Sequence, residues 1–160
     1  MTRNFITNQS KIHGKGAFAT KDFEKGDIIF IFKGRVYKRD NKNVQDTFAN
    51  PDSIGIDKNT WIDPIRDFHF INHSCDPNMG IKGRVTFCAL KNIRKGEELT
   101  FDYSINEADP RWHMKCNCGA RNCRKVIKSV QSLPVNIYKH YMPFVPRYFM
   151  QVYNKSRKLT

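Results

Sequence analysis

The chain has 160 residues, a formal net charge of +13 at pH 7 and 39% hydrophobic residues. This length predicts one domain, with at most an appendage, and enough residues for a real core. The sequence lacks the run of about 18 apolar residues that a membrane-spanning helix needs, and its start, Met1–Phe5, lacks the apolar region of a signal peptide. We therefore expect a protein of the cytoplasm or the nucleus, with no membrane partner.

Short strands are predicted along the first 105 residues, starting at Phe5–Ile6 and after Gly16. The clearest is Ile28–Phe32, whose unbroken β-branched and aromatic residues predict burial on both faces. Residues 38–53 are polar and predict a loop-rich insert. Turns separate the strands, which is typical of a mainly β domain. The remaining predicted strands are Ile54–Ile56 and Thr60–Ile62, which form a hairpin, then Arg84–Leu90 and Leu99–Phe101.

The end of the chain has a different pattern, which predicts two short helices. Ser132–Pro134 predicts the start of a helix that continues to Tyr141. Pro146 predicts the start of a second helix, in which Val145, Phe149 and Val152 share one face. The aromatic residues favour a lid packed on the β domain. A helix lying on a membrane surface is the weaker interpretation, because the apolar stripe is short.

The charge is unevenly distributed along the chain. Residues 41–80 carry three Lys/Arg and six Asp/Glu, whereas residues 121–160 carry nine Lys/Arg and no acidic residue. These two stretches predict surfaces of different character. The acidic stretch suits a basic substrate, and the basic end is either a solvated face or a docking surface for a partner that bears nucleic acid.

The segment Phe70–Asn78 concentrates polar chemistry within a predicted turn. A short apolar run breaks there into Asn, Ser, Asp and Pro, which predicts a strand that ends in a tight turn. Asp76–Pro77 sets the turn, because Pro fixes φ and biases the preceding residue away from helix. A thiol, an imidazole, two amides and a hydroxyl are more than a plain connector needs, so we expect a functional site here.

The cysteine pattern indicates a metal site. Five cysteines are an odd number, which argues against a complete disulfide framework. Cys116, Cys118 and Cys123 lie within eight residues, and structural zinc takes four ligands. Cys75 in the predicted turn is the obvious fourth ligand, whereas His113 as a competing ligand and a set of free thiols remain alternatives. Cys88, in the middle of a predicted strand, is expected to be an inert core thiol.

Four motifs follow one another along the chain: Gly14–Ala19, Phe70–Asn78, Gly96–Tyr103 and Cys116–Cys123. In this order they resemble the SET-domain protein-lysine methyltransferases with a post-SET zinc segment. The resemblance covers roughly residues 5–127 and implies a β-clip fold of short strands, in which the segment before Tyr103 threads beside Asn72 in a knot-like crossing. It implies a SET domain at 1–115, a post-SET zinc segment at 116–127 and a basic, aromatic helical extension at 128–160. The stretch Trp61–Pro64 resembles the compact bacterial and fungal branch.

The resemblance implies an S-adenosylmethionine-dependent protein-lysine N-methyltransferase that acts on a histone or another basic protein. By this resemblance, Cys75 completes the zinc site. The residues that would bind the cofactor are Lys15, Gly16 and Phe18 at its methionine end, Asn72 and His73 at its amino group and adenine, Tyr103 at the methyl group, and Val126 and Ile127 over the adenine.

Tyr103 and Phe101 are the predicted catalytic residues. A lysine must lose its proton before it attacks, and a narrow desolvated channel lowers the pKa of its amine. The Tyr103 hydroxyl would orient that amine. Phe101 would face the same side of a strand, two residues earlier. In the family a Phe at this position leaves room for a methylated amine to rotate, which implies di- or trimethyl-lysine as the product.

Two departures from the family pattern concern the substrate channel. His69 stands where many members have Arg, and Ser53 or Ile54 stands where many have a channel Tyr. The alternatives to an enzyme are a non-catalytic, zinc-stabilised binding module of the same fold and a basic nucleic-acid binder. Charge alone supports the nucleic-acid binder, since the cysteine spacing does not match the zinc modules that read DNA.

Overall fold

The structure is a computed structural model and describes residues 3–38 and 52–158. In this part of the chain the strands are short and all seven pairings between them are antiparallel. The mainly β prediction is therefore confirmed. The strands are β1 (Phe5–Gln9), β2 (Lys15–Ala19), β3 (Ile28–Ile31), β4 (Gly34–Lys38), β5 (Ile54–Asp57), β6 (Thr60–Pro64), β7 (Met79–Lys82), β8 (Thr86–Ala89), β9 (Glu98–Leu99), β10 (His113–Lys115) and β11 (Val126–Lys128).

The described strands form four small sheets, in the orders β1-β2-β9, β3-β8-β7, β4-β6-β5 and β10-β11. The predicted hairpin is present as β5 and β6, with Ile54 opposite Ile62. The helices are the 3₁₀ helices η1 (Arg66–Phe70), η2 (Tyr103–Asn106) and η3 (Val130–Ser132), and the α-helices α1 (Val135–Tyr141) and α2 (Arg147–Lys158). Among the described residues, no helix is both long and apolar enough to cross a membrane.

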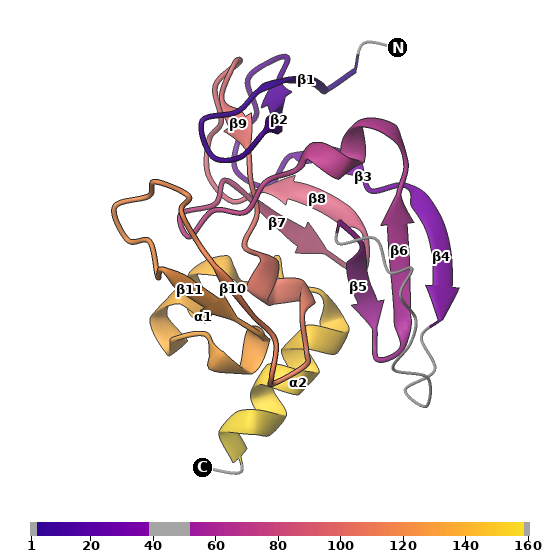
Figure 1. Ribbon diagram of the computed structural model, residues 1–160, viewed down its shortest axis with the longest axis vertical. Helices are drawn as coiled ribbons and strands as arrows, with labels where there is room; N and C mark the ends of the chain where they lie inside the picture. The colour runs from indigo at the N-terminus through magenta and orange to yellow at the C-terminus, as the bar shows by residue number, and fades with distance from the viewer. Residues whose placement is uncertain (1–2, 39–51, 159–160) are drawn as a thin grey trace.

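The two α-helices cover one end of the β domain, as the sequence predicted. Figure 1 shows α1, α2 and the β10–β11 pair together below the other sheets, with the two termini at opposite ends. Tyr141, Phe149 and Tyr153 join the same buried core as Phe87 and Met79. Burying one such side chain contributes about 1.5–3 kcal/mol, so the helices are an integral part of the domain.

Strand β3 differs from the prediction, because only one of its faces is buried. Ile29 is 1% exposed, whereas Ile28 and Ile31 are 60% and 54% exposed. The strand lies at the edge of its sheet, and its register shifts between Ile28 and Phe30. Only the inward side chains of an edge strand beside such a bulge reach the core. The prediction of burial on both faces is therefore wrong.

Two predicted boundaries also change. Phe70 ends the 3₁₀ helix η1 and does not lie in a strand, because the backbone after it pairs with Phe101 from a distant segment. The first α-helix begins at Val135, and Pro134 is its extended N-cap residue. Leu133 is extended as well, which is the usual conformation before Pro, so Ser132 cannot cap the helix.

Other expectations hold with smaller adjustments. The second helix begins directly after Pro146, and Val145 and Phe149 are buried. Strand Arg84–Leu90 is shortened to Thr86–Ala89, and the strand predicted at Leu99–Phe101 begins one residue earlier and ends at Leu99, as Glu98–Leu99. Of the predicted polar insert at 38–53, residues 39–51 lie outside the described residues.

Candidate functional site

The segment Thr100–Tyr103 runs against the turn that follows Phe70. The Phe101 amide donates to the Asn72 carbonyl at 3.3 Å, and the Ser74 amide donates to the Phe101 carbonyl at 3.2 Å. The Met79 amide donates to the Thr100 carbonyl at 3.0 Å. Two motifs that lie about thirty residues apart in the sequence therefore share backbone hydrogen bonds, which places Tyr103 beside Asn72 as the resemblance implied.

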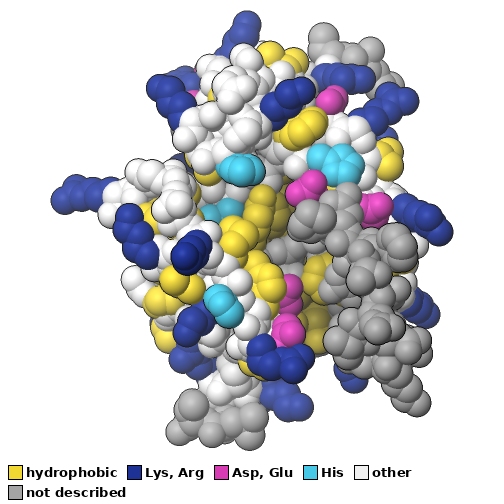
Figure 2. Space-filling view, viewed as in Figure 1, with side chains coloured by type: hydrophobic (Ala, Val, Ile, Leu, Met, Phe, Trp, Pro, Cys, Tyr) yellow, Lys and Arg dark blue, Asp and Glu magenta, His cyan; other side chains and the backbone are white. Residues whose placement is uncertain are grey.

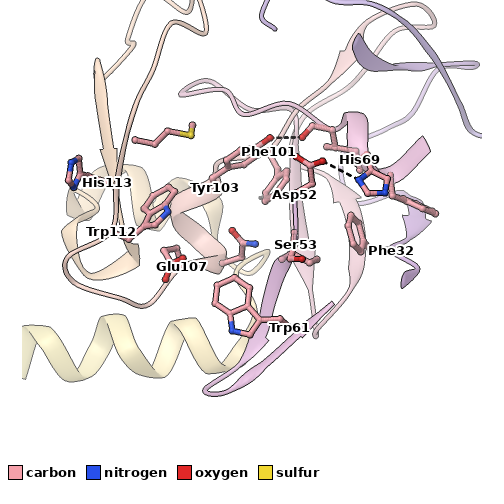
Figure 3. Close-up of a pocket in the computed structure, with 15 residues that line it drawn as sticks. Phe32, Asp52, Ser53, Trp61, His69, Phe101, Tyr103, Glu107, Trp112 and His113 are labelled. Atoms are coloured by element: carbon pink, nitrogen blue, oxygen red, sulfur yellow. Dashed lines mark hydrogen bonds and ion pairs between the residues drawn. The ribbon is translucent and has the colours of Figure 1, made fainter. Parts of the chain in front are cut away.

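A pocket of about 380 Å³ opens beside this crossing. Figure 3 shows Trp112 and His113 on one side, Phe32 and His69 on the other, and Tyr103 between them. On the surface it is a hollow with hydrophobic side chains inside and acidic ones at its edge (Figure 2). We call it the aromatic pocket. Its lining residues are Phe32, Asp52, Ser53, Ile54, Trp61, Phe68, His69, Ile71, Phe101, Tyr103, Asn106, Glu107, Trp112, His113 and Met114.

Tyr103 is held at the wall of the aromatic pocket by two hydrogen bonds. Its hydroxyl donates to the Ile71 carbonyl at 2.8 Å, and its amide donates to His73 Nδ1 at 3.1 Å. Burial, and then the negative charge of Asp52, raise the pKa of the phenol well above its ordinary value. The phenol therefore stays protonated near neutral pH. With its proton directed to Ile71, its oxygen can accept a hydrogen bond from an incoming amine.

Phe101 lies next to Tyr103, although the reason given by the sequence is wrong. Their ring centroids are 4.9 Å apart and both residues line the aromatic pocket. The expected alternation of a strand does not apply, because Tyr103 is the first residue of η2. The turn of the backbone into η2 brings the rings together, and an edge-on contact with Phe87 at 5.1 Å holds Phe101 in place.

Asn72 lies at the other side of the crossing, among oxygen atoms from β2, β9 and the loop before β2. Its Nδ2 is 2.9 Å from the Lys15 carbonyl, 2.8 Å from Glu98 Oε1, and 3.2 Å from both Ser10 Oγ and the His13 carbonyl. One NH₂ group has only two hydrogens for these four acceptors. This group, which we call the Asn72 acceptor site, therefore has spare acceptors that suit the ammonium group of a ligand such as S-adenosylmethionine.

Three of the predicted cofactor residues lie on β2, close to this acceptor site. Gly16 is needed for a reason that the sequence did not show: a Cβ there would overlap the Glu98 carboxylate and crowd Ser10. Phe18 is the register partner of Glu98, and the Lys15 ammonium lies 5.4 Å from the centre of the Phe70 ring. Sequence reasoning missed Glu98, whose only signal was its place in the Gly96–Tyr103 motif.

The His73 side chain is turned away from the Asn72 acceptor site. Its Nδ1 accepts the Tyr103 amide hydrogen, so the ring hydrogen is on Nε2, which lies 3.4 Å from Cys75 Sγ. Burial lowers the pKa of the imidazole to about 4, although Asp102 acts in the opposite direction. The ring is thus a neutral link between Tyr103 and Cys75, and only the His73 backbone can serve a cofactor.

Cys75, Cys116, Cys118 and Cys123 converge as a cysteine cluster. The sulfur of Cys116 lies 3.8 Å from that of Cys75 and 3.7 Å from that of Cys123. Four sulfurs at about 2.3 Å from a tetrahedral zinc ion are about 3.8 Å apart. The Cys75 amide donates to Cys118 Sγ at 3.4 Å, which is the kind of contact that orients a metal ligand. The donor set therefore fits zinc.

His73 is close enough to compete for the fourth position. A ligand atom from each of His73, Cys75, Cys116 and Cys118 lies within 4.8 Å of the others. However, metal binding at Nε2 requires a lone pair there, while the Tyr103 amide already occupies the lone pair of Nδ1. The neutral ring has only one such lone pair, so this geometry favours Cys123.

The two other residues weighed as metal ligands or reactive thiols lie elsewhere. His113 lines the aromatic pocket, and its Nδ1 is 3.1 Å from the Arg111 carbonyl. Cys88 is buried in β8 and its thiol is 3.9 Å from the Thr86 carbonyl. Burial raises the pKa of the Cys88 thiol, which agrees with an inert core residue.

The structure separates the two residues predicted to cover the adenine. Ile127 is 0% exposed and packs into the cysteine cluster, whereas Val126 is 44% exposed on the opposite face of β11. Side chains alternate between the two faces of a strand, so both cannot cover one ligand. Ile127 is needed for packing around the sulfurs, which leaves Val126 as the exposed candidate.

Sequence reasoning also missed the wall that comes from β10. Trp112 and Met114 line the aromatic pocket and also pack against the cysteine cluster. Their signal was available, because they are large apolar residues two and four positions before Cys116. Cys116 lies beside Cys75 in the cysteine cluster, so Trp112 and Met114 lie near Cys75 and the crossing as well.

Comparison with known proteins agrees with this geometry. A SET-domain family model matches residues 14–104. The chain is 33% identical over 135 residues to histone-lysine N-methyltransferase trithorax of Drosophila virilis, and 31% identical over 134 residues to histone-lysine N-methyltransferase 2B of Homo sapiens. Each match covers 74% of this chain but only 3% and 5% of the relative, so the chain is far shorter than these proteins.

The fold is similar to solved structures as well. A crystal structure of KRYPTONITE in complex with mCHH DNA, an H3(1-15) peptide and SAH matches with a TM-score of 0.62 and 26% identity, over 79% of this chain and 30% of that one. A second KRYPTONITE structure, with mCHG DNA and SAH, matches with a TM-score of 0.63. The motif order, the crossing at Tyr103 and these matches lead to one conclusion: the chain belongs to the SET-domain family.

Proposed function

We propose that this chain is an S-adenosylmethionine-dependent protein-lysine N-methyltransferase. The observation that carries the proposal is the position of Tyr103, between the aromatic pocket, which suits a lysine side chain, and the Asn72 acceptor site, which suits a cofactor ammonium group. The relatives are named histone-lysine N-methyltransferases, and the KRYPTONITE structure holds an H3 peptide and SAH. The proposed substrate is accordingly a lysine in a histone or another basic protein.

The residues of this chain would prepare the lysine amine for attack. Phe32, Phe68 and Phe101 line the aromatic pocket and exclude water, which lowers the pKa of a bound ammonium group. The Tyr103 oxygen and the Ile71 carbonyl can accept the amine hydrogens and so direct its lone pair. Because the pKa of Tyr103 is raised, the phenol orients the amine and does not act as the base. The bound cofactor supplies the electrophilic methyl group.

The cysteine cluster would hold one zinc ion and join the post-SET segment to the SET domain. Cys75 comes from the turn beside Asn72, and the other three sulfurs come from residues 116–123. A metal there would hold β10, and with it Trp112, against the aromatic pocket. We therefore propose a SET domain at 1–115, a zinc segment at 116–127 and a helical extension at 128–160.

The direct test is incubation with methyl-labelled S-adenosylmethionine and mixed core histones. We expect label on lysine side chains, found by digestion and mass spectrometry. If the chain binds the cofactor but transfers no label to histones or to the basic proteins of a lysate, the non-catalytic binding module is favoured. A protein that binds nucleic acid but not the cofactor would favour the third interpretation.

Product analysis tests the role of Phe101. Its ring lies 4.9 Å from Tyr103 and carries no hydroxyl to hold a methylated amine in one orientation. We expect di- or trimethyl-lysine from the wild-type chain, and a shift toward monomethyl-lysine in Phe101→Tyr. Mass spectra with only monomethyl product after exhaustive reaction would contradict this prediction.

Charge around the site suits a basic substrate. Asp52 and Glu107 line the aromatic pocket, and Figure 2 shows the acidic side chains at its edge, with Lys and Arg farther out. Residues 41–51 of the acidic stretch lie outside the described residues. A chain that acts on chromatin or on another nucleoprotein would work in the nucleus or the cytoplasm, as the sequence predicted.

The basic end is proposed to dock on the nucleic acid that accompanies the substrate. Arg157 is left out of this proposal, because it already donates to the Leu133 carbonyl at 2.8 Å and lies over the Tyr153 ring at 4.9 Å. It holds α2 in place. The exposed candidates are therefore Arg147, Lys155 and Lys158 on α2.

Neutralising those three residues to Gln should lower the rate on nucleosomes but not on free histones. The rate difference should shrink as salt rises, because phosphate contacts release bound counterions. Rates are compared at low and moderate salt on both substrates. If the triple variant shows the same salt dependence as the wild type, the basic end is only a solvated face.

A further inference from the structure

Asp102, directly before Tyr103, is a buried carboxylate with 0% exposure. Its Oδ1 accepts the Ser104 amide hydrogen at 3.0 Å, and its Oδ2 accepts from Arg124 Nη2 at 2.6 Å and from the Tyr141 hydroxyl at 2.9 Å. A buried charge is tolerated only when it is paired and hydrogen-bonded. We call Asp102 with these three donors the Asp102 hub.

The three donors of the hub come from three different segments of the chain. Ser104 belongs to η2, Arg124 follows the last cysteine of the cluster, and Tyr141 is the last residue of α1. A rigid carboxylate can satisfy all three only when the segments are packed in one arrangement. The hub therefore joins the SET domain, the cysteine-rich segment and the helical extension at a single side chain.

This carboxylate also sets the backbone at Tyr103. Asp102 is the N-cap of η2, whose first residue is Tyr103, and its side chain accepts the Ser104 amide hydrogen. Such a cap satisfies a free amide and fixes the direction in which a helix starts. A carboxylate that rotated away from its partners would release this turn. The orientation of the Asp102 side chain and that of Tyr103 are thus coupled through one peptide unit.

Arg124 cannot hold the carboxylate alone, because its guanidinium is shared. Its Nη1 donates to Ser104 Oγ at 3.3 Å and its Nε to Cys75 Sγ at 3.5 Å. The hydroxyl of Tyr141 approaches the same carboxylate oxygen from α1, and the Tyr141 residue is only 2% exposed. Among the described residues of the helical extension, the Tyr141 hydroxyl is the group that donates a hydrogen bond to Asp102.

Building on the function proposed above, we propose that Tyr141 is a positioning residue for methyl transfer. Its hydroxyl orients Asp102, and Asp102 in turn holds the η2 turn that carries Tyr103. The extension at 128–160 is on this view part of the active-site machinery as well as a cover for the core. Tyr141 acts through Asp102 and Tyr103 and does not itself line the aromatic pocket.

Tyr141→Phe removes the hydroxyl and keeps the packed ring. Tyr138→Phe is the matched control: Tyr138 is a buried tyrosine one turn earlier in α1, and its ring stacks on Tyr153 with centroids 3.6 Å apart. Loss of one hydrogen bond to a charged group is large enough to measure, whereas ring packing is the same in both variants.

The first measurement is amide hydrogen exchange, which needs no substrate. In Tyr141→Phe the Ser104 amide should exchange about tenfold faster than in the wild type, while amides of β8 stay unchanged. In Tyr138→Phe the Ser104 amide should exchange as in the wild type. Equal exchange of Ser104 in the two variants, or a uniform increase in every amide, would overturn the positioning role.

The second measurement is turnover on core histones, combined with Tyr103→Phe. We expect Tyr141→Phe to lower kcat about tenfold with little change in the KM for S-adenosylmethionine, and to have less than about a twofold effect when Tyr103 is already Phe. A full tenfold loss in the Tyr103→Phe background would overturn the inference. If the wild type labels no protein, the proposed function fails, and the exchange measurement alone decides the role of Tyr141.

Discussion

Replacing Tyr103 with Phe is expected to lower the rate of methyl transfer by roughly two orders of magnitude, the scale for losing one preorganised polar group. The hydroxyl and the Ile71 carbonyl together place two polar atoms beside the aromatic rings of the pocket. Without the hydroxyl, an amine in the pocket loses one acceptor and its orientation. Single-turnover measurements with saturating cofactor isolate this step from binding.

The same variant should keep its fold and its affinity for the cofactor. The Tyr103 amide, which binds His73, is unaffected by the change, and the Asn72 acceptor site does not include the phenol. Tyr148→Phe, on α2, is a suitable control that removes a hydroxyl elsewhere. Turnover equal to that of the wild type would remove Tyr103 from the mechanism.

Replacing Cys75 with Ala is expected to remove zinc and to weaken cofactor binding in the same variant. Wild-type chain should contain one zinc ion, and Cys75→Ala much less, as measured by atomic emission after gel filtration. Cys75 is the only member of the cysteine cluster that comes from the SET domain, so its loss would separate residues 116–127 from the turn beside Asn72. Metal binding and folding of such a segment are coupled.

Two further cysteine variants sharpen this test. Cys123→Ala should lose zinc as well, because the hydrogen bond from Tyr103 to His73 leaves His73 no lone pair for the metal. Cys88→Ala should keep full zinc occupancy, since that thiol is buried in β8. Full zinc content in Cys75→Ala would reject the proposed ligand set, and full content in Cys123→Ala alone would indicate His73 as the fourth ligand.

Local sequence patterns were sufficient to predict the class of the fold and the motifs of the site. Alternation and turn residues are local properties, so the β5–β6 hairpin at Ile54–Pro64 and the helix after Pro146 could be predicted from neighbouring residues alone. The grouping of Cys116, Cys118 and Cys123 likewise follows from their short spacing. The order of the four motifs was sufficient to name the family.

How these motifs come together depends on long-range contacts that the folded chain alone reveals. The crossing makes Phe101 pair with Asn72 and Ser74, so Phe70 ends a 3₁₀ turn where local pattern predicted a strand. Edge position in a sheet, which no local pattern reports, left Ile28 and Ile31 exposed. Long-range pairing overrides local preference because the backbone hydrogen bonds of a buried segment have to be satisfied wherever partners are found.

The polar network of the site also depends on long-range contacts. Glu98 occupies the space that Gly16 leaves free, and Tyr141 reaches Asp102 across a separation of 39 residues. In the sequence, Tyr141 is one of two tyrosines on a short helix, and nothing distinguishes it from Tyr138. A buried carboxylate requires donors from whichever segments surround it, and only the packed chain shows that one of them is the helical extension.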